Sequence, residues 1–296
     1  MGYTCGGAAG KGAGAECAGT RGLKKGRNRD VMAETKNALS FRGVNFSYGT
    51  DPVLRDVTFS VPQGEFLIII GPNGGGKTTL LKLALGLLVP ESGTISVFGK
   101  KPGEDRSVAG YVPQDTGRNR DFPITALEVA LQGRLGFPGG RLSYGRKDRE
   151  AAMEALKALK MESLAGRSMG ELSQGQRQRV LIARGLASDP GVLFLDEPLA
   201  SIDPETRDML LTLLGELCGR LSVVMVSHDM SAVSAHATAV ACVNRKVFYH
   251  DSAEIGPDAM EQVWGRCPVE LVAHGIPHRV LAVHDHDHGG EGCSHD

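Results

Sequence analysis

The sequence predicts an α/β fold with a mainly parallel core sheet, and three stretches support this prediction. The apolar run Phe66 to Ile70 leads through a glycine-rich turn into the helix-favouring stretch Leu80 to Leu85, which is the order strand, turn, helix. The stretch Val192 to Leu195 is wholly apolar, as is typical of a strand buried on both faces of a parallel sheet. A further largely apolar stretch, Leu221 to Val226, predicts another strand of the same sheet.

The composition is that of an ordinary globular protein, with 41% hydrophobic and 23% charged residues in a chain of 296. The formal net charge of -1 provides no overall field that would attract nucleic acid. The apolar runs are far shorter than the ~20 residues of a membrane-spanning helix. Six cysteines lie far apart without a C-x-x-C pair, which indicates a reducing compartment. We therefore expect a cytosolic protein without a membrane span.

The glycine-rich turn after Ile70 fits the phosphate-binding pattern G-x-x-x-x-G-K-[ST]. Glycines leave room for backbone N–H groups to surround a phosphate, and the following helix adds the positive end of its dipole. Lys77 is expected to reach the β- and γ-phosphates, Thr78 to offer its hydroxyl to Mg²⁺, and Thr79 to contact the α-phosphate. The alternative is a turn that contains lysine and threonine by coincidence. The predicted cradle consists of Gly71, Pro72, Asn73, Gly74, Gly75, Gly76, Lys77, Thr78 and Thr79.

The predicted strand from Val192 to Glu197 ends in two carboxylates, Asp196 and Glu197. Ligands of open α/β sheets bind at the carboxyl ends of the strands. We expect Asp196 to hold Mg²⁺ through water and Glu197 to orient or deprotonate an attacking water. The alternative is a strand that simply leaves into a polar turn. Gln114 and His228 follow two further predicted strands, although His228 alone would be typical of a surface histidine.

An antiparallel β subdomain is predicted at the N-terminal side of the cradle. Leu39 to Tyr48 and Val53 to Val61 alternate apolar and polar residues around the turn 49–52, as half-buried strands do. Thr94 to Phe98 predicts another short strand. Tyr48 ends the first strand, where its ring could stack on a base or belong to the rim of the core.

A helical insert is predicted from about residue 115 to 187. Thr125 and Glu128 have the spacing of a capping box, and Arg146 to Met161 has the apolar spacing of an amphipathic helix. Ser173 is a predicted helix N-cap whose neighbouring backbone amides form a second potential anion site.

The chain divides into four predicted regions. Residues 1–37 lack apolar periodicity, so a disordered tail is expected, and Met32 is an alternative start. Residues 38–252 form the folded domain that contains the helical insert. Residues 253–283 are a C-terminal extension, and residues 284–296 are a histidine-rich tail.

Residues from about Leu39 to Asp251 resemble the nucleotide-binding subunit of an ATP-binding cassette (ABC) transporter, which has a P-loop NTPase fold. The resemblance makes Tyr48 the adenine-stacking aromatic, Gly71 to Thr78 the Walker A motif, Gln114 the Q-loop glutamine, Leu172 to Gln176 the signature, Leu193 to Asp196 the Walker B motif, Glu197 the catalytic glutamate, Ala200 to Asp203 the D-loop and His228 the switch histidine. The signature departs from the usual Leu-Ser-Gly-Gly-Gln because Gln174 occupies its third position.

The resemblance implies hydrolysis of ATP with Mg²⁺, in which Glu197, His228, Gln114 and Lys77 are the catalytic residues. It implies Mg²⁺ ligands among Thr78, Gln114 and Asp196. It also implies a head-to-tail dimer with a second copy, in which ATP lies between the P-loop of one subunit and the signature of the other. Further ATP contacts would come from Ser173, Gly175, Gln176 and Asp203.

The family's other partners are membrane components. The resemblance implies integral membrane permease subunits, contacted through the groove around Gln114 and the insert stretch Phe122 to Leu131. It implies a peripheral position at the cytoplasmic face of the inner membrane and an indirect link to an extracytoplasmic metal-binding protein. No nucleic-acid partner is expected.

Two stretches indicate the transported substrate. Asp121 to Arg134 resembles the same region in ATPases of bacterial zinc and manganese importers. Imidazole with thiolate suits Zn²⁺ better than Mn²⁺, and the expected tail ligands are His284, His286, His288, Cys293 and His295. An incidental polar tail is the alternative. We therefore expect import of a divalent metal, zinc before manganese. The alternatives are an importer of another substrate such as an iron chelate, or a soluble ABC ATPase, which would require a long coiled-coil insert or a second cassette.

Overall fold

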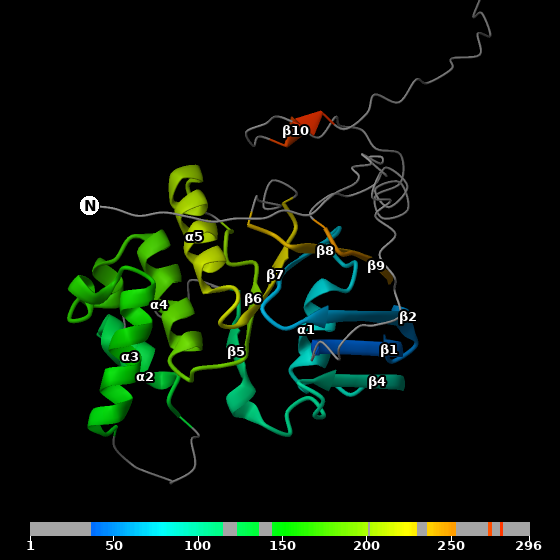
Figure 1. The fold of residues 1–296 in the computed structure, drawn as a ribbon, viewed down its shortest axis with the longest axis horizontal. Coiled ribbons are helices and arrows are strands. Elements are labelled where there is room, and N and C mark those ends of the chain that lie inside the picture. The colour runs from blue at the N-terminus through cyan, green and yellow to red at the C-terminus, as the bar shows by residue number, and fades with distance from the viewer. Residues whose placement is uncertain are drawn as a thin grey trace, which may run out of the picture. The chain divides into compact units, whose positions relative to one another are not determined.

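The computed structural model describes residues 37–114, 123–135, 144–200, 202–229 and 236–252, together with two short strands at 272–273 and 279–280. Expectations for residues 1–36, for Phe122 and for the tail 284–296 lie outside the described residues. The elements, shown in Figure 1, are β1 (Asn37–Tyr48), β2 (Asp51–Pro62), β3 (Phe66–Ile70), α1 (Lys77–Ala84), β4 (Ser92–Val97), η1 (Arg106–Val108), β5 (Ala109–Val112), α2 (Ala126–Gln132), α3 (Arg146–Ala158), η2 (Glu162–Leu164), η3 (Met169–Glu171), α4 (Gln174–Leu186), β6 (Val192–Asp196), α5 (Pro204–Leu217), β7 (Ser222–Ser227), β8 (Ala239–Asn244), β9 (Lys246–His250), β10 (Val272–Ala273) and β11 (Arg279–Val280).

The core is a six-stranded sheet in the order β5-β6-β7-β3-β8-β9. The first five strands run parallel, and β9 pairs with β8 in the antiparallel direction. In the register of this sheet, Ile70 lies opposite both Ser227 and Cys242. Val112 lies opposite Leu195 in the same way. The carboxyl ends of β5, β6, β7 and β3 therefore meet at one edge, as the sequence predicts.

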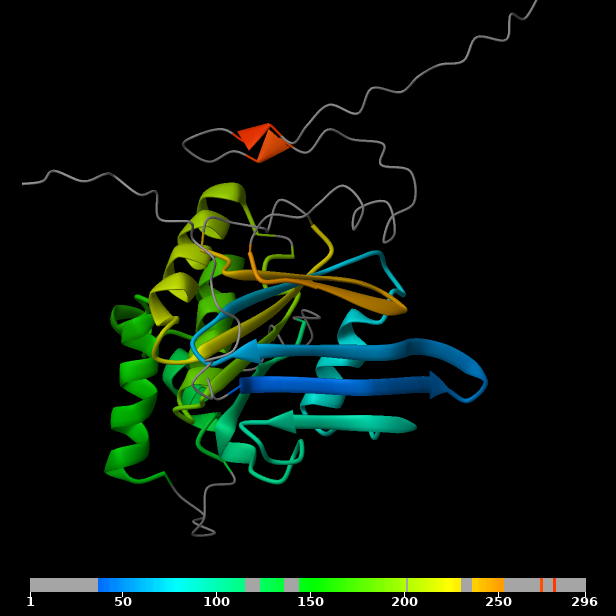
Figure 2. The same cartoon turned by 45° about the vertical axis from the view of Figure 1, so that its right-hand side comes forward.

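The two faces of the core sheet carry different layers, which Figures 1 and 2 show from two directions. Successive side chains of a strand point to opposite faces. Leu193 and Leu195 accordingly pack in the cluster that includes the buried faces of α2 to α5. Val192 and Phe194 pack in the cluster with α1 and the antiparallel strands. Burial on both faces explains why β6 is apolar throughout.

The antiparallel sheet has the order β2-β1-β4. Its first two strands pair with Leu39 opposite Val61 and Tyr48 opposite Asp51, so the connecting turn is Gly49-Thr50. Gly49 has φ of 61°, a left-handed conformation that glycine adopts without strain. The predicted antiparallel subdomain is confirmed, although β2 begins two residues earlier than the alternation suggests.

The helical layer begins with sequence-encoded caps. Thr125 accepts a hydrogen bond from the Glu128 backbone N–H at 3.3 Å, and the Glu128 carboxylate accepts one from the Thr125 N–H at 2.8 Å. This reciprocal pair satisfies two N–H groups that the first turn of a helix leaves free. Within the described ranges, no helix is both long and apolar enough to cross a membrane.

Candidate nucleotide-binding and catalytic site

The loop between β3 and α1 is shaped by glycines in conformations that other residues avoid. Gly74 and Gly76 have φ of 77° and 101°. A side chain at Gly71 would place its Cβ 2.0 Å from the carbonyl oxygen of Val243 on β8. Only glycine therefore fits position 71, and the backbone N–H groups of the loop stay accessible to a phosphate.

The turn between β8 and β9 fixes the outer side of this loop. The N–H of Arg245 donates to the carbonyl of Gly75 at 3.0 Å, and the Arg245 carbonyl accepts from the N–H of Arg55 on β2 at 2.7 Å. The phosphate-binding loop is thereby connected to both sheets by backbone hydrogen bonds. Strands β8 and β9 are not among the strands expected above, although the apolar stretch 239–243 followed by Asn244 is a strand-and-turn signal.

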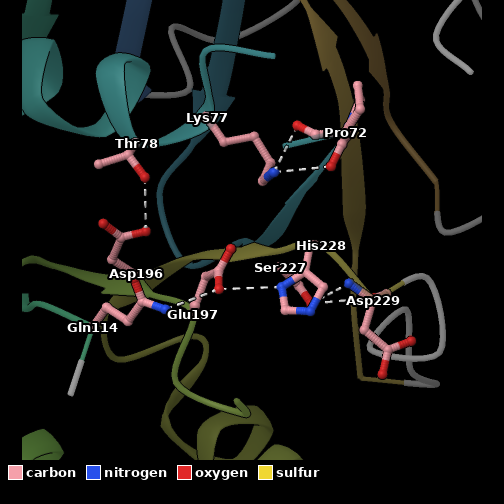
Figure 3. A network of polar contacts seen from close by, with 10 residues as sticks. Pro72, Lys77, Thr78, Gln114, Asp196, Glu197, Ser227, His228 and Asp229 are labelled. Carbon is pink, nitrogen blue, oxygen red and sulfur yellow. Dashed lines mark hydrogen bonds and ion pairs between the residues drawn. The ribbon is translucent and has the colours of Figure 1, made fainter. Parts of the chain in front are cut away.

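Lys77 lies buried at the start of α1, where its ammonium donates to the carbonyls of Gly71 at 2.8 Å and Pro72 at 3.0 Å. Figure 3 shows these contacts within the loop. Burial lowers the pKa of Lys77, while the nearby charges of Glu197 and Asp196 act in the opposite direction. A phosphate oxygen carries negative charge and would therefore attract the Lys77 ammonium more strongly than the neutral carbonyls do, because opposite charges interact strongly where water is largely excluded.

Asp196 ends β6 and accepts a hydrogen bond from the Thr78 hydroxyl at 3.2 Å. Burial raises the pKa of Asp196, and the Thr78 hydrogen bond opposes that rise. A hydroxyl and a carboxylate beside a phosphate cradle are oxygen donors of the kind that Mg²⁺ prefers. Thr78 and Asp196 could therefore hold this ion.

One carboxylate oxygen of Glu197 contacts two neighbouring side chains. Its Oε2 accepts a hydrogen bond from Gln114 Nε2 at 3.3 Å and lies 3.1 Å from Nδ1 of His228. Figure 3 shows these three residues side by side. Glu197 has φ of 50°, and its N–H donates to the Val226 carbonyl at 3.1 Å. Such a backbone costs roughly 1–3 kcal/mol and is found preferentially at functional sites.

The residues of the predicted signature form a separate group at the start of α4. The Ser173 hydroxyl accepts from the Gln176 N–H at 3.2 Å, and the Gln176 side chain accepts from the Ser173 N–H at 2.9 Å. Gly175 is packed closely against α5, because a Cβ there would lie 2.3 Å from Cγ2 of Thr206. Asp203 caps α5 by accepting from the Thr206 N–H at 2.9 Å.

The structure therefore brings together one half of the predicted site and not the other. Lys77, Thr78, Gln114, Asp196, Glu197 and His228 are close to one another. Among the described contacts, Ser173, Gly175, Gln176 and Asp203 share no hydrogen bond or ion pair with these residues. A single copy of the chain thus presents two half-sites.

Tyr48 lies at the end of β1 with 49% of its surface exposed. Its ring forms a T-shaped pair with that of Phe46, at a centroid distance of 4.9 Å and an interplanar angle of 88°. An exposed aromatic in this position has a surface on which a base could stack.

The chain is similar in sequence to known proteins of one family. Residues 54–200 match the family model described as ABC transporter. A zinc transport system ATP-binding protein of Treponema pallidum is 38% identical over 217 residues, which cover 73% of this chain and 82% of that protein. A manganese transport system ATP-binding protein of Bacillus subtilis is 42% identical over 188 residues, which cover 63% and 75%.

Solved structures show the same fold. A metal-chelate type ABC transporter in an inward-facing conformation has a TM-score of 0.71 at 30% identity and covers 81% of this chain and 93% of its own. A dimeric ATP-binding cassette bound to ADP and phosphate has a TM-score of 0.59 at 27% identity and covers 72% and 98%.

The chain belongs to the ABC transporter family. Within that family it is an ATP-binding cassette, an ATPase with the P-loop NTPase fold. The predicted fold class is thereby confirmed, with its mainly parallel core sheet, antiparallel β subdomain and helical layer.

Replacing Glu197 with glutamine should preserve ATP binding and lower kcat by at least about 100-fold, because a positioned general base contributes ~10²–10⁴-fold. The phosphate cradle and Asp196 are unchanged in this variant. Phosphate release measures turnover, and size-exclusion chromatography with Mg-ATP should show a trapped dimer. Lys77→Ala is the comparison variant and should lose nucleotide binding itself. Wild-type turnover in Glu197→Gln would contradict the role of Glu197.

Replacing Asp196 with asparagine should raise the melting temperature at neutral pH while impairing hydrolysis. Burial raises the pKa of Asp196 in the folded protein, so the folded state favours the protonated carboxyl. The protonated carboxyl adds to the free energy of unfolding below the unfolded pKa of ~3.9, and this gain is lost as pH rises through the folded pKa. The buried charge therefore opposes folding at neutral pH, and asparagine removes it. The gain should shrink as pH falls. Exposed Asp208 provides the control variant, Asp208→Asn. An unchanged or lower melting temperature would contradict the desolvation cost.

Proposed function

We propose that this chain is the ATP-hydrolysing subunit that powers import of a divalent transition metal, zinc before manganese, through a separate integral membrane permease. The observation that carries the proposal is the set of relatives at 37–42% identity that are named as zinc or manganese transport ATP-binding proteins. The subunit would lie at the cytoplasmic face of the inner membrane and would depend indirectly on an extracytoplasmic metal-binding protein.

The geometry of the site supports hydrolysis by positioning. Phosphoryl transfer is accelerated mainly by orientation and charge stabilisation. The loop N–H groups and Lys77 would bind the phosphates, and Glu197 would orient the attacking water. His228 and Gln114 hold the Glu197 carboxylate through the shared Oε2. Mg²⁺ would neutralise part of the phosphate charge. Thr78 and Asp196 would hold this ion, and Gln114 is the further expected ligand.

The two half-sites support a head-to-tail dimer with a second copy. Ser173, Gly175, Gln176 and Asp203 cluster where α4 and α5 begin, apart from Lys77 and its neighbours. Helix N-termini with free N–H groups bind anions, so this cluster would contact the γ-phosphate of ATP held by the other subunit. Gln174 lies in the first turn of α4 and would form part of the same contact.

The permease would dock in a groove beside Gln114, which has a volume of about 1020 Å³. The groove is lined by the edge strand β5 and by the ends of α2 and α4. Leu135 lines it with 66% of its surface exposed. Burial lowers the pKa of Arg184 in the groove, and no hydrogen bond or ion pair of its guanidinium is found among the described residues. An acidic group of a docking segment would therefore pair with Arg184.

A second candidate substrate is a metal chelate such as an iron chelate. The observation that favours it is the fold similarity, at 30% identity, to a metal-chelate type ABC transporter. Free zinc and chelated metal can be compared directly in uptake experiments.

The variant Arg184→Glu, made in cells that express the cognate permease, tests the docking and the substrate together. Zinc uptake should fall about tenfold, which corresponds to ~1.4 kcal/mol of lost docking energy, while ATP hydrolysis by the isolated subunit persists. Arg146→Glu, on the exposed side of α3, is the control and should leave uptake unchanged. Unchanged uptake in Arg184→Glu would exclude this groove as the docking site.

Uptake of an iron chelate in place of zinc by the wild type would overturn the zinc assignment.

The tail ligands remain a proposal, because residues 284–296 lie outside the described part. A short Gly- and Asp-rich segment provides no packed surroundings, so His284, His286, His288, Cys293 and His295 should bind Zn²⁺ more weakly than a preorganised site. Protonation should release zinc as pH falls through ~6.5. Calorimetric zinc titration of the full chain and of a chain lacking residues 284–296 measures this binding. Equal zinc binding by both chains would refute the tail site.

A further inference from the structure

An ion pair connects the start of α5 to the residue that follows His228. Nη1 of Arg207 lies 2.8 Å from Oδ2 of Asp229, and the two side chains are 26% and 40% exposed. Arg207 stands in the first turn of α5, where its N–H donates to the carbonyl of Asp203 at 2.9 Å. Nothing in the sequence pattern links Arg207 to Asp229, which lies 22 positions later in the chain.

Asp229 is also bonded to the residue on the other side of His228. The Asp229 N–H donates to the Ser227 hydroxyl at 3.0 Å, and that hydroxyl lies 3.2 Å from the Asp229 carbonyl. His228 is therefore enclosed in a small turn whose outer end is held by Arg207. Figure 3 shows this turn presenting the His228 ring to Glu197.

These contacts form a closed path through the site. The chain runs from Glu197 into α5, and Arg207 on α5 binds Asp229. The neighbouring His228 returns to Glu197 through the 3.1 Å contact of its Nδ1. Partly exposed ion pairs contribute little to overall stability, so the effect of this pair should be on the orientation of His228.

We propose that Arg207 is a positioning residue that keeps the His228 imidazole at the Glu197 carboxylate by holding Asp229. Asp203 is the N-cap of α5, and Arg207 lies in the first turn of the same helix, so the Arg207–Asp229 pair joins the start of α5 to the turn that carries His228. This inference rests on the proposed ATPase function of the site.

The test compares Arg207→Ala, Arg207→Lys and the equal-volume variant Asp229→Asn in the full chain. The imidazole nitrogen resonances of histidine-labelled protein are recorded by NMR, and the His228 signal is assigned by its loss in His228→Gln. ATPase kcat and KM and the melting temperature are measured on the same samples. Arg146→Ala removes an exposed ion pair of α3 and is the matched control.

Arg207→Ala and Asp229→Asn should both shift the His228 resonance. They should also lower kcat about tenfold and change KM less than about twofold. A fall in kcat without a matching change in KM indicates loss of an interaction that is used in the transition state. Arg207→Lys should retain a higher kcat than Arg207→Ala. In a chain that already carries His228→Gln, adding Arg207→Ala should not lower kcat further. An unshifted His228 resonance would overturn the proposal even if kcat fell. A shifted resonance with unchanged kcat would overturn it equally. Absence of wild-type ATPase activity would refute the proposed function alone, because the resonance still reports the position of His228.

Discussion

The parallel pairing of β5, β6, β7 and β3 is the constraint on which the site depends. Backbone hydrogen bonds in a fixed register place Val112, Leu195 and Ile70 near a common edge. Each strand carries a group with a chemical role at its last residue or within the next two: Gln114 after β5, Asp196 and Glu197 at the end of β6, His228 after β7 and the phosphate loop after β3. A slip of one residue in any pairing would turn its side chains to the opposite face of the sheet. The precision of the site is therefore set by the main chain.

Burial at this edge shifts the pKa values of two charged groups, Lys77 in the phosphate cradle and Asp196 beside it, in opposite directions. It lowers the pKa of Lys77 and raises the pKa of Asp196, so both charges are disfavoured by their surroundings. Their mutual attraction and the Thr78 hydrogen bond offset only part of this cost. A site arranged in this way is suited to a ligand that carries phosphate and a divalent cation together, because each charge then gains a partner.

The sequence was sufficient for the parts of the structure that depend on local patterns. The apolar stretch of β6 and the caps at Thr125 and Ser173 are observed where they were predicted. Strands β1 and β2 also form as predicted, although residues 38–41 of β1 are buried consecutively and do not alternate. The phosphate loop is equally local, because its glycines all lie between positions 71 and 76 of the chain. The contacts of Arg245 and Arg207 could not be predicted, since they join positions whose proximity is a product of the tertiary fold. The separation of Ser173 from Lys77 also required coordinates.

The turn at Arg245 has a consequence for local stability. It bonds the phosphate loop through Gly75 and the antiparallel sheet through Arg55, and it lies between β8 and the edge strand β9. Edge strands open at lower free energy than central ones. Fraying of β9 would therefore remove the outer support of the phosphate loop long before the core unfolds. A bound nucleotide would in turn slow amide exchange in the β8–β9 hairpin, since any ligand of the closed form suppresses opening by mass action.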